Sequence, residues 1–222
     1  MHSPSSLLNP TYDVGGAPQI GAPIIYLVRH AQNDDDKQGK IRGLKDRSLN
    51  EEGERQLGGL RDFFKHRPVM AIVTDDLSRT RQTAMAVALV AGCEIETDIG
   101  LRSWDVGKLE GKSMDAHKLE IQDFKTHPDK VPVGGQSWGE FKREAIDTIG
   151  RWSRRAMESS GPIVLVTHGS FIQVFFEHYD ATPADADYDH TPLDQAGVAA
   201  LYLTRDGTKL KALRGGLESI DE

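Results

Sequence analysis

The sequence has very little cysteine. Its 222 residues include one, Cys93, so no disulfide can form within the chain. A single thiol, without the Cys/His spacing of a zinc site, is typical of proteins from a reducing compartment, and we expect a cytoplasmic location. A chain of this length buries a substantial core without disulfide or metal crosslinks. The composition therefore predicts one large soluble domain.

Long apolar runs and excess positive charge are also missing. No run is long enough to cross a bilayer, and no basic segment followed by an apolar stretch opens the chain, so we expect neither a membrane span nor a signal peptide. Acidic residues outnumber basic ones by 34 to 27, which gives a formal net charge of −7. This sign disfavours a broad nucleic-acid surface, and any positive field must be local.

Strands and helices are predicted to alternate along the chain. Short apolar runs predict strands at 24–29, 69–74, 94–98, 162–167, 198–204 and 209–213. Helical periodicity and capping residues predict helices that begin near Asn50 and that span 78–91, about 137–158 and 170–179. This alternation predicts an α/β fold, a three-layer α/β/α sandwich with a mostly parallel central sheet. Residues 1–22, rich in Pro, Gly, Ser and Asn, are interpreted as a flexible arm, and 216–222 as a tail.

Two histidines stand directly after apolar runs. Arg29 ends the first predicted strand and His30 follows it, and His168 follows the run at 163–167. A single histidine at a strand end is often only a polar terminator, but two in equivalent contexts favour a site. In open α/β sheets ligands bind at the carboxyl ends of the strands. Two histidines at that edge, one beside an arginine, indicate an anion site.

A third segment at 73–84 supports the same interpretation. A strand ends here and a helix begins, with Asp76 or Ser78 as its expected N-cap. Arg79 falls in the first helical turn, where the helix dipole disfavours a cation. Because helix N-termini also bind phosphate well, this position of Arg79 indicates an anionic partner.

These segments resemble a known family. LVRHAQ at 27–32 resembles the LVRHGE/Q signature of the histidine phosphatase superfamily, the phosphoglycerate-mutase-like proteins. TDDLSRTRQTA at 74–84 resembles its second-arginine motif, and LVTHGS at 165–170 its second-histidine motif. GLKDRSLNEEG at 43–53 and VGGQSWGEF at 133–141 are similar to two further family segments. The resemblance covers about residues 24–205 and implies a catalytic domain over 23–215, with 103–160 as an irregular and helical region that covers the site.

The resemblance assigns a role to each residue of the site. His30 matches the family's nucleophile, which attacks phosphorus in line as a neutral imidazole and forms a phosphohistidine. Arg29, Arg79 and His168 match the clamp that holds the phosphoryl group. The arginines already neutralise the dianion, so neither a metal nor a cofactor is expected. The implied activity is metal-independent hydrolysis of a small phosphomonoester.

Three further positions are open to more than one interpretation. Asn33 stands where the family often has Thr beside the phosphate, so its amide is a candidate phosphate donor. Arg42 matches a position near the mouth of the site and is either a substrate contact or a solvated loop residue. The run Asp34–Asp36 could bind a divalent ion, but a solvated loop is the favoured interpretation.

The sequence departs from the family pattern at several positions. Ala31 replaces a glycine, and Ser103 stands where the family usually has its acid, a glutamate. Asp105 is our candidate general acid, because residues i and i+2 of an extended segment face the same way. The alternative is that Asp105 only caps a turn before Gly107. Glu110 is a second candidate, and the GGES segment has lost its carboxylate to Gln136.

These departures leave alternative functions open. The chain could be a slow phosphatase that prefers good leaving groups, or a non-catalytic phosphate-binding relative. Retention of both histidines and both arginines favours an enzyme. A phosphoglycerate-type mutase is a further alternative, although the glutamate-centred substrate motif of those mutases is missing. The sequence does not decide the physiological substrate, and it leaves a homo-oligomer open.

Overall fold

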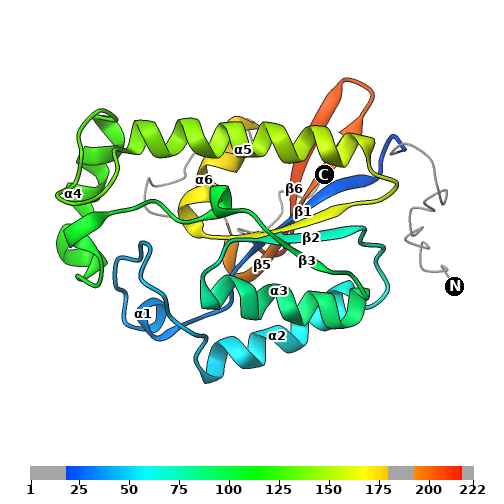
Figure 1. The fold of residues 1–222 in the computed structure, drawn as a ribbon, viewed down its shortest axis with the longest axis horizontal. Helices are drawn as coiled ribbons and strands as arrows, with labels where there is room; N and C mark the ends of the chain where they lie inside the picture. The colour runs from blue at the N-terminus through cyan, green and yellow to red at the C-terminus, as the bar shows by residue number, and fades with distance from the viewer. Residues whose placement is uncertain (1–18, 180–192, 217–222) are drawn as a thin grey trace, which may run out of the picture.

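The computed structural model describes residues 19–179 and 193–216, which form one mixed sheet covered by helices (Figure 1). Within these residues the sheet has six strands in the order β3-β2-β4-β1-β5-β6. The strands are β1 (Pro23–Arg29), β2 (Ala71–Thr74), β3 (Ile95–Thr97), β4 (Ile163–Thr167), β5 (Leu193–Thr204) and β6 (Gly207–Gly216). The four strands β1, β2, β3 and β4 run parallel to one another. β5 pairs antiparallel with β1 on one side and with β6 on the other. The prediction of a mostly parallel sheet is confirmed.

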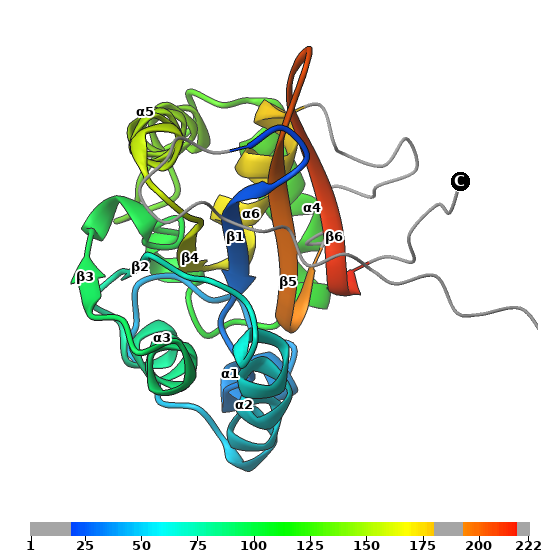
Figure 2. The same ribbon diagram turned by 90° about the vertical axis from the view of Figure 1, so that its right-hand side faces the viewer.

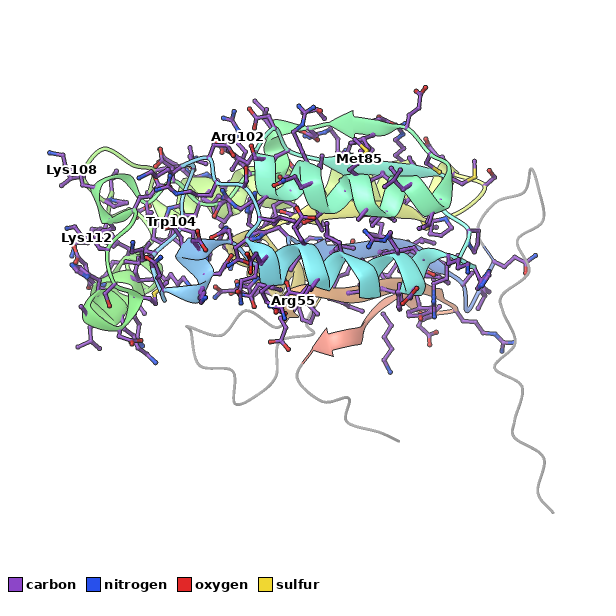
Figure 3. All side chains as sticks on the ribbon, turned by 90° about the horizontal axis from the view of Figure 1, so that it is seen from below. Arg55, Met85, Arg102, Trp104, Lys108 and Lys112 are labelled. Atoms are coloured by element: carbon purple, nitrogen blue, oxygen red, sulfur yellow. The ribbon has the colours of Figure 1, made fainter. Side chains whose placement is uncertain are left out.

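Helices cover both faces of the sheet and complete three layers (Figure 2). The helices are α1 (Asp34–Lys37), α2 (Glu51–Phe64), α3 (Ser78–Ala91), α4 (Met114–Thr126), α5 (Trp138–Glu158) and α6 (Gly169–His178). α2 and α3 lie side by side on one face, with Arg55 and Met85 on their outer sides (Figure 3). α5 and α6 lie on the other face. Among the described helices, none combines the length and apolarity that a membrane span needs.

The central strand β1 shows how the sequence builds this core. Its side chains alternate between the two faces of the sheet. Ile25 and Leu27 belong to the apolar cluster that includes residues of α5 and α6. Tyr26 and Val28 belong to the cluster that includes residues of α2 and α3. Because the strand is buried on both faces, its sequence is a nearly continuous run of apolar residues.

Most element boundaries agree with the sequence predictions, with two corrections. α3 ends at Gly92, whose φ of 70° is left-handed, as expected of a helix terminated by glycine. Its N-cap, however, is Leu77 rather than Asp76 or Ser78. The second correction is α4, which lies inside the stretch predicted as irregular. Its sequence gives a weak signal because only Ile121 and Phe124 of its residues are buried.

The strand register brings distant segments together at one edge of the sheet. Arg29 of β1 pairs with Thr167 of β4, so His30 and His168 leave neighbouring strands side by side. Thr74 of β2 pairs with Val166 of β4, so the next residue along the chain, Asp75, emerges at the same edge. The first and last thirds of the chain therefore meet where the parallel strands end.

Candidate active site

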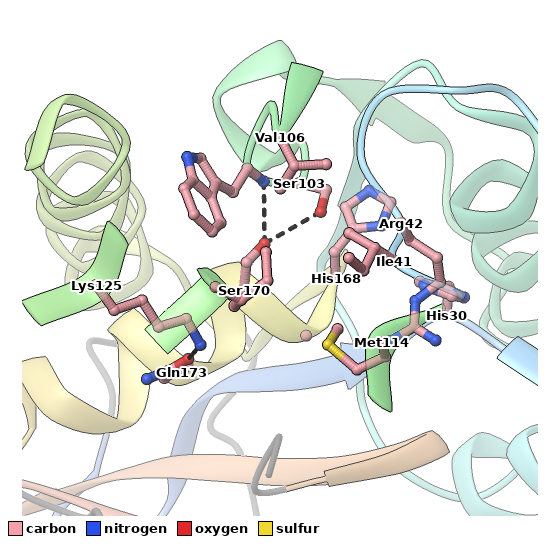
Figure 4. Close-up of a pocket in the computed structure, with 13 residues that line it drawn as sticks. His30, Ile41, Arg42, Ser103, Val106, Met114, Lys125, His168, Ser170 and Gln173 are labelled. Atoms are coloured by element: carbon pink, nitrogen blue, oxygen red, sulfur yellow. Dashed lines mark hydrogen bonds between the residues drawn. The ribbon is translucent and has the colours of Figure 1, made fainter. Parts of the chain in front are cut away.

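His30 and His168 face a small cavity at this edge, and their ring centroids lie 5.1 Å apart (Figure 4). Arg42, Lys125, Gln173 and the hydroxyls of Ser103 and Ser170 also line the cavity. Apolar side chains, Met114 and Ile121 of α4 among them, form the rest of its wall. The cavity thus combines two imidazoles, two cationic side chains and an apolar surface.

Hydrogen bonding fixes the protonation of His30. Its Nδ1 lies 2.8 Å from the carbonyl oxygen of Ala31, which can only accept, so Nδ1 carries the proton. Burial holds the pKa of His30 well below its usual value, with His168, Arg79 and Arg29 acting in the same direction. The ring is therefore neutral at pH 7, and Nε2 holds the free lone pair. This is the state that a nucleophilic histidine needs.

Ala31 fits where the family pattern has glycine. The residue is fully buried, and it is not among the described residues with positive φ. Its backbone N–H donates to Oγ1 of Thr83, 3.0 Å away on α3. Because the backbone here needs no left-handed conformation, an alanine is accommodated without strain.

Arg79 is held by the backbone of the 43–45 loop. Its Nη1 donates to the carbonyl of Lys45 and its Nη2 to that of Gly43, each at 2.9 Å, while Nε donates to Nδ1 of His168 at 3.2 Å. The Glu110 carboxylate accepts from the backbone N–H groups of Gly43 and Lys45. Glu110, the second candidate acid, therefore braces the loop that orients Arg79 and is not among the residues of the cavity wall.

Arg29 and Asn33 each have a buried donor that finds no hydrogen-bond partner among the residues that the structure describes. Arg29 donates from Nη1 to the carbonyl of Leu193 at 2.7 Å, but its Nε is unpaired. Asn33 caps α1, accepting from the backbone N–H of Asp36, and leaves its Nδ2 unpaired. Burial lowers the pKa of Arg29 to about 10. Unpaired buried donors are costly. Neither Arg29 nor Asn33 is among the residues that line the cavity, so their predicted role in phosphate binding stays a prediction.

The acidic run is not a solvated loop, and that prediction is wrong. Asp34, Asp35 and Asp36 begin the short helix α1, because Asn33 and Asp36 form a capping box. The Asp36 side chain is fully buried, and its Oδ1 lies 2.6 Å from Nη1 of Arg42. The described residues contain no group of three or more carboxylates, histidines or cysteines placed to hold a metal ion. Asp36 instead holds Arg42 at the cavity wall.

Asp105 does not face the cavity, so the expectation that it shares the site face is wrong. Its Oδ1 accepts from the backbone N–H of Gly107 at 3.0 Å, and its side chain lines a neighbouring groove. The chain turns directly after Asp105, at Val106 and Gly107, whose φ is 54°. Ser103 lines both this groove and the cavity, with its Oγ 3.1 Å from Oγ of Ser170.

Sequence reasoning missed Asp75 and Lys125. Asp75 directly follows β2, a signal of the same kind as His30 after β1. Lys125 lies on α4, which was not predicted, and its Nζ donates to Oε1 of Gln173 at 2.7 Å. The Lys125 ammonium also lies 5.1 Å from the ring centroid of Trp138.

Comparison with known proteins identifies the family. The model of the histidine phosphatase superfamily, branch 1, matches residues 25–215. The chain belongs to this superfamily. A probable phosphoglycerate mutase GpmB from Photorhabdus laumondii is 30% identical over 190 residues, which cover 76% of this chain and 86% of the relative. The corresponding protein of Escherichia coli O1:K1 is 30% identical over 148 residues, 65% of this chain and 69% of that one.

Solved structures share the fold. A phosphoglycerate mutase from Bacillus anthracis matches with a TM-score of 0.71 at 20% identity, covering 85% of this chain and 91% of that one. A mycobacterial glucosyl-3-phosphoglycerate phosphatase matches with a TM-score of 0.68 at 20% identity, covering 85% and 96%. The alpha-ribazole phosphatase of Shigella flexneri matches with a TM-score of 0.69 at 19% identity, covering 88% of this chain and 99% of that one. Both mutases and phosphatases are built on this α/β fold.

Proposed function

We propose that this protein is a metal-independent phosphomonoester hydrolase that acts through a phosphohistidine on His30. The observation that carries the proposal is the bond from His30 Nδ1 to the Ala31 carbonyl, which leaves Nε2 unprotonated at a cavity shared with Arg42 and His168. In the first step Nε2 attacks phosphorus in line, a P–N bond forms and the bond to the leaving oxygen breaks. In the second step water attacks the phosphohistidine, and phosphate leaves.

Positive charge around His30 supports phosphoryl transfer. Catalysis of this reaction rests on positioning and on stabilising the charge that spreads over the phosphoryl oxygens. Arg42 lines the cavity, and the guanidinium of Arg79 contacts His168 directly. Arg29 and Asn33 retain unpaired buried donors. In this proposal the phosphoryl group of a small substrate binds in the cavity beside His30 and Arg42.

Ser103 makes the enzyme selective for good leaving groups. A serine hydroxyl has too high a pKa to protonate a departing alkoxide near neutral pH. The two carboxylates considered for this role, Asp105 and Glu110, bond to backbone N–H groups away from the cavity. Aryl phosphates, whose leaving groups depart without a proton, are therefore turned over faster than alkyl phosphates.

The second candidate function is a phosphoglycerate-type mutase. The names of the relatives that are 30% identical favour it. A mutase returns the phosphoryl group to a phosphoglycerate, whereas a hydrolase passes it to water. Incubation with 3-phosphoglycerate separates the two, because a mutase accumulates the 2-isomer and a hydrolase releases phosphate.

The test is a panel of phosphate esters with EDTA present, run with the unmodified chain and with His30→Ala. The proposal predicts turnover that EDTA leaves unchanged and that His30→Ala removes. Orthovanadate, a mimic of the five-coordinate phosphoryl state, should inhibit. No turnover of any ester would indicate a phosphate-binding relative without activity. Activity lost with EDTA and restored by a divalent ion would reject the mechanism.

A further inference from the structure

We propose that Asp75 is a positioning residue that fixes the orientation and the tautomer of His168 for phosphoryl binding. The inference rests on the proposed function, since it gives Asp75 a part in that same site. Asp75 follows β2, and His168 follows β4, the neighbouring parallel strand. Asp75 is fully buried and His168 is 2% exposed, and Oδ2 of Asp75 makes a short hydrogen bond with Nε2 of His168.

The partners of His168 allow one neutral tautomer. Nε of Arg79 is a donor only, so Nδ1 of His168 must accept and carries no proton. The ring proton therefore lies on Nε2 and is donated to the Asp75 carboxylate. Both ring nitrogens are engaged, and the ring can neither turn over nor change tautomer without losing a buried hydrogen bond.

The carboxylate itself is held by the start of α3. Oδ1 of Asp75 accepts from the backbone N–H of Leu77 at 2.8 Å and from Oγ1 of Thr80 at 2.6 Å. The same turn of α3 carries Arg79, whose guanidinium meets the other side of the His168 ring. One helix terminus thus sets the position of a carboxylate, an imidazole and a guanidinium together.

Asp75 also determines whether His168 can take up a proton. Burial lowers the pKa of His168; Asp75 acts in the opposite direction, while Arg79 and Arg42 lower it further. Loss of the Asp75 carboxylate should therefore lower the pKa of His168 further and keep the ring neutral.

The test variant is Asp75→Asn, compared with Thr80→Val. An asparagine oxygen can still accept from Leu77 and Thr80, but its amide nitrogen cannot accept the Nε2 proton of His168. Thr80→Val removes a bond to the same carboxylate and leaves its contact with His168. We expect Asp75→Asn to weaken orthovanadate binding and to lower kcat/KM on p-nitrophenyl phosphate, each by about 10- to 100-fold, as for one hydrogen bond to a charged group. Thr80→Val should lower vanadate affinity and kcat/KM less than Asp75→Asn does, even where the two variants lose the same thermal stability.

Two further measurements show whether Asp75 acts through His168. In a His168→Gln background, Asp75→Asn should add little to the loss of vanadate affinity, because its partner is already gone. Histidine ¹⁵N spectra of the unmodified chain should show His168 protonated at Nε2, with the proton displaced in Asp75→Asn. These spectra need no turnover, so they test the inference even if no ester is hydrolysed. The inference would be overturned if Asp75→Asn lowered vanadate affinity equally in the presence and absence of His168. It would also be overturned if the His168 proton of the unmodified chain were on Nδ1.

Discussion

Asp36 and Arg42 form a buried ion pair at the cavity wall, with Oδ1 of the carboxylate 2.6 Å from Nη1 of the guanidinium. The Asp36 side chain is fully buried, whereas a quarter of the Arg42 side chain is exposed. The other oxygen of Asp36 accepts from the backbone N–H of Asn33 at 2.9 Å. One carboxylate therefore ties the start of α1, which follows β1 and His30, to a cation that lines the cavity.

Asp36→Asn should weaken this tie without removing the cap of α1. We expect KM for a phosphate ester to rise several-fold, because Arg42 loses its anchor. The free energy of unfolding should fall by about 1.5–3 kcal/mol, the usual contribution of a hydrogen bond to a charged group. Asp35 and Arg47 supply the matched control, because this neighbouring pair is more exposed, with 43% of the Arg47 side chain accessible. Arg47→Gln should change neither quantity much, as for most exposed pairs.

Ser103→Glu should supply the missing acid. The new carboxyl would stand at the cavity wall where the serine hydroxyl meets Ser170. We expect kcat/KM for an alkyl phosphate to rise at least about 10-fold, part of the 10²–10⁴-fold range of general acid catalysis. The rate on p-nitrophenyl phosphate should hardly change. Ser103→Gln, of similar shape without an acid, is the control, and an equal effect of both substitutions would refute the assignment.

Asp105→Ala should affect stability rather than chemistry. The carboxylate caps the turn at Gly107, so we expect a loss of about 0.5–2 kcal/mol, similar to that of a lost helix cap. The ratio of kcat/KM values for alkyl and aryl phosphates should stay unchanged. Thermal unfolding and parallel kinetics measure both quantities. A selective loss of about 10²-fold or more on the alkyl ester would restore Asp105 as the general acid.

Stability should fall in mild acid because two histidines are buried in the neutral form. The pKa values of His30 and His168 are both lowered in the folded protein. Below the unfolded value of about 6.5, the unfolded chain takes up protons that the folded chain does not, so stability present above that pH is lost as the pH falls. Each histidine contributes a slope of up to about 1.4 kcal/mol per pH unit. Denaturant unfolding of His30→Ala between pH 7 and pH 5 should show about half the slope of the unmodified chain, and an unchanged slope would contradict the assignment.

The sequence predicted which residues meet at the carboxyl edge of the sheet better than it predicted the walls of the cavity. His30, Arg79 and His168 stand at strand or helix ends, so the pattern of apolar runs and the topology of an open sheet place them. The alternative that Asp105 caps a turn before Gly107 is confirmed, but local sequence could not show that its side chain lines the neighbouring groove rather than the cavity. That outcome depends on the close packing of Gly107 against the backbone at Val133 and Gly135.

The acidic partners were hidden for a related reason. Asp36 and Asp75 are charged residues that sequence patterns place on the surface or in a turn. Each is buried against a partner that the pattern of apolar runs does not reveal: Arg42 pairs with Asp36 from the following loop, and His168 pairs with Asp75 from another strand end. The bond between Asp75 and His168 depends on β2 and β4 being neighbours, although 93 residues separate the two side chains in sequence.

The most direct test of the account is the identity of the phosphorylated residue during turnover. The protein, quenched while it hydrolyses p-nitrophenyl phosphate, should carry one phosphoryl group on Nε2 of His30, stable in alkali and labile in acid. His30→Ala should carry none and should show no turnover. A phosphoryl group on another residue, or full turnover by His30→Ala, would contradict the proposed mechanism.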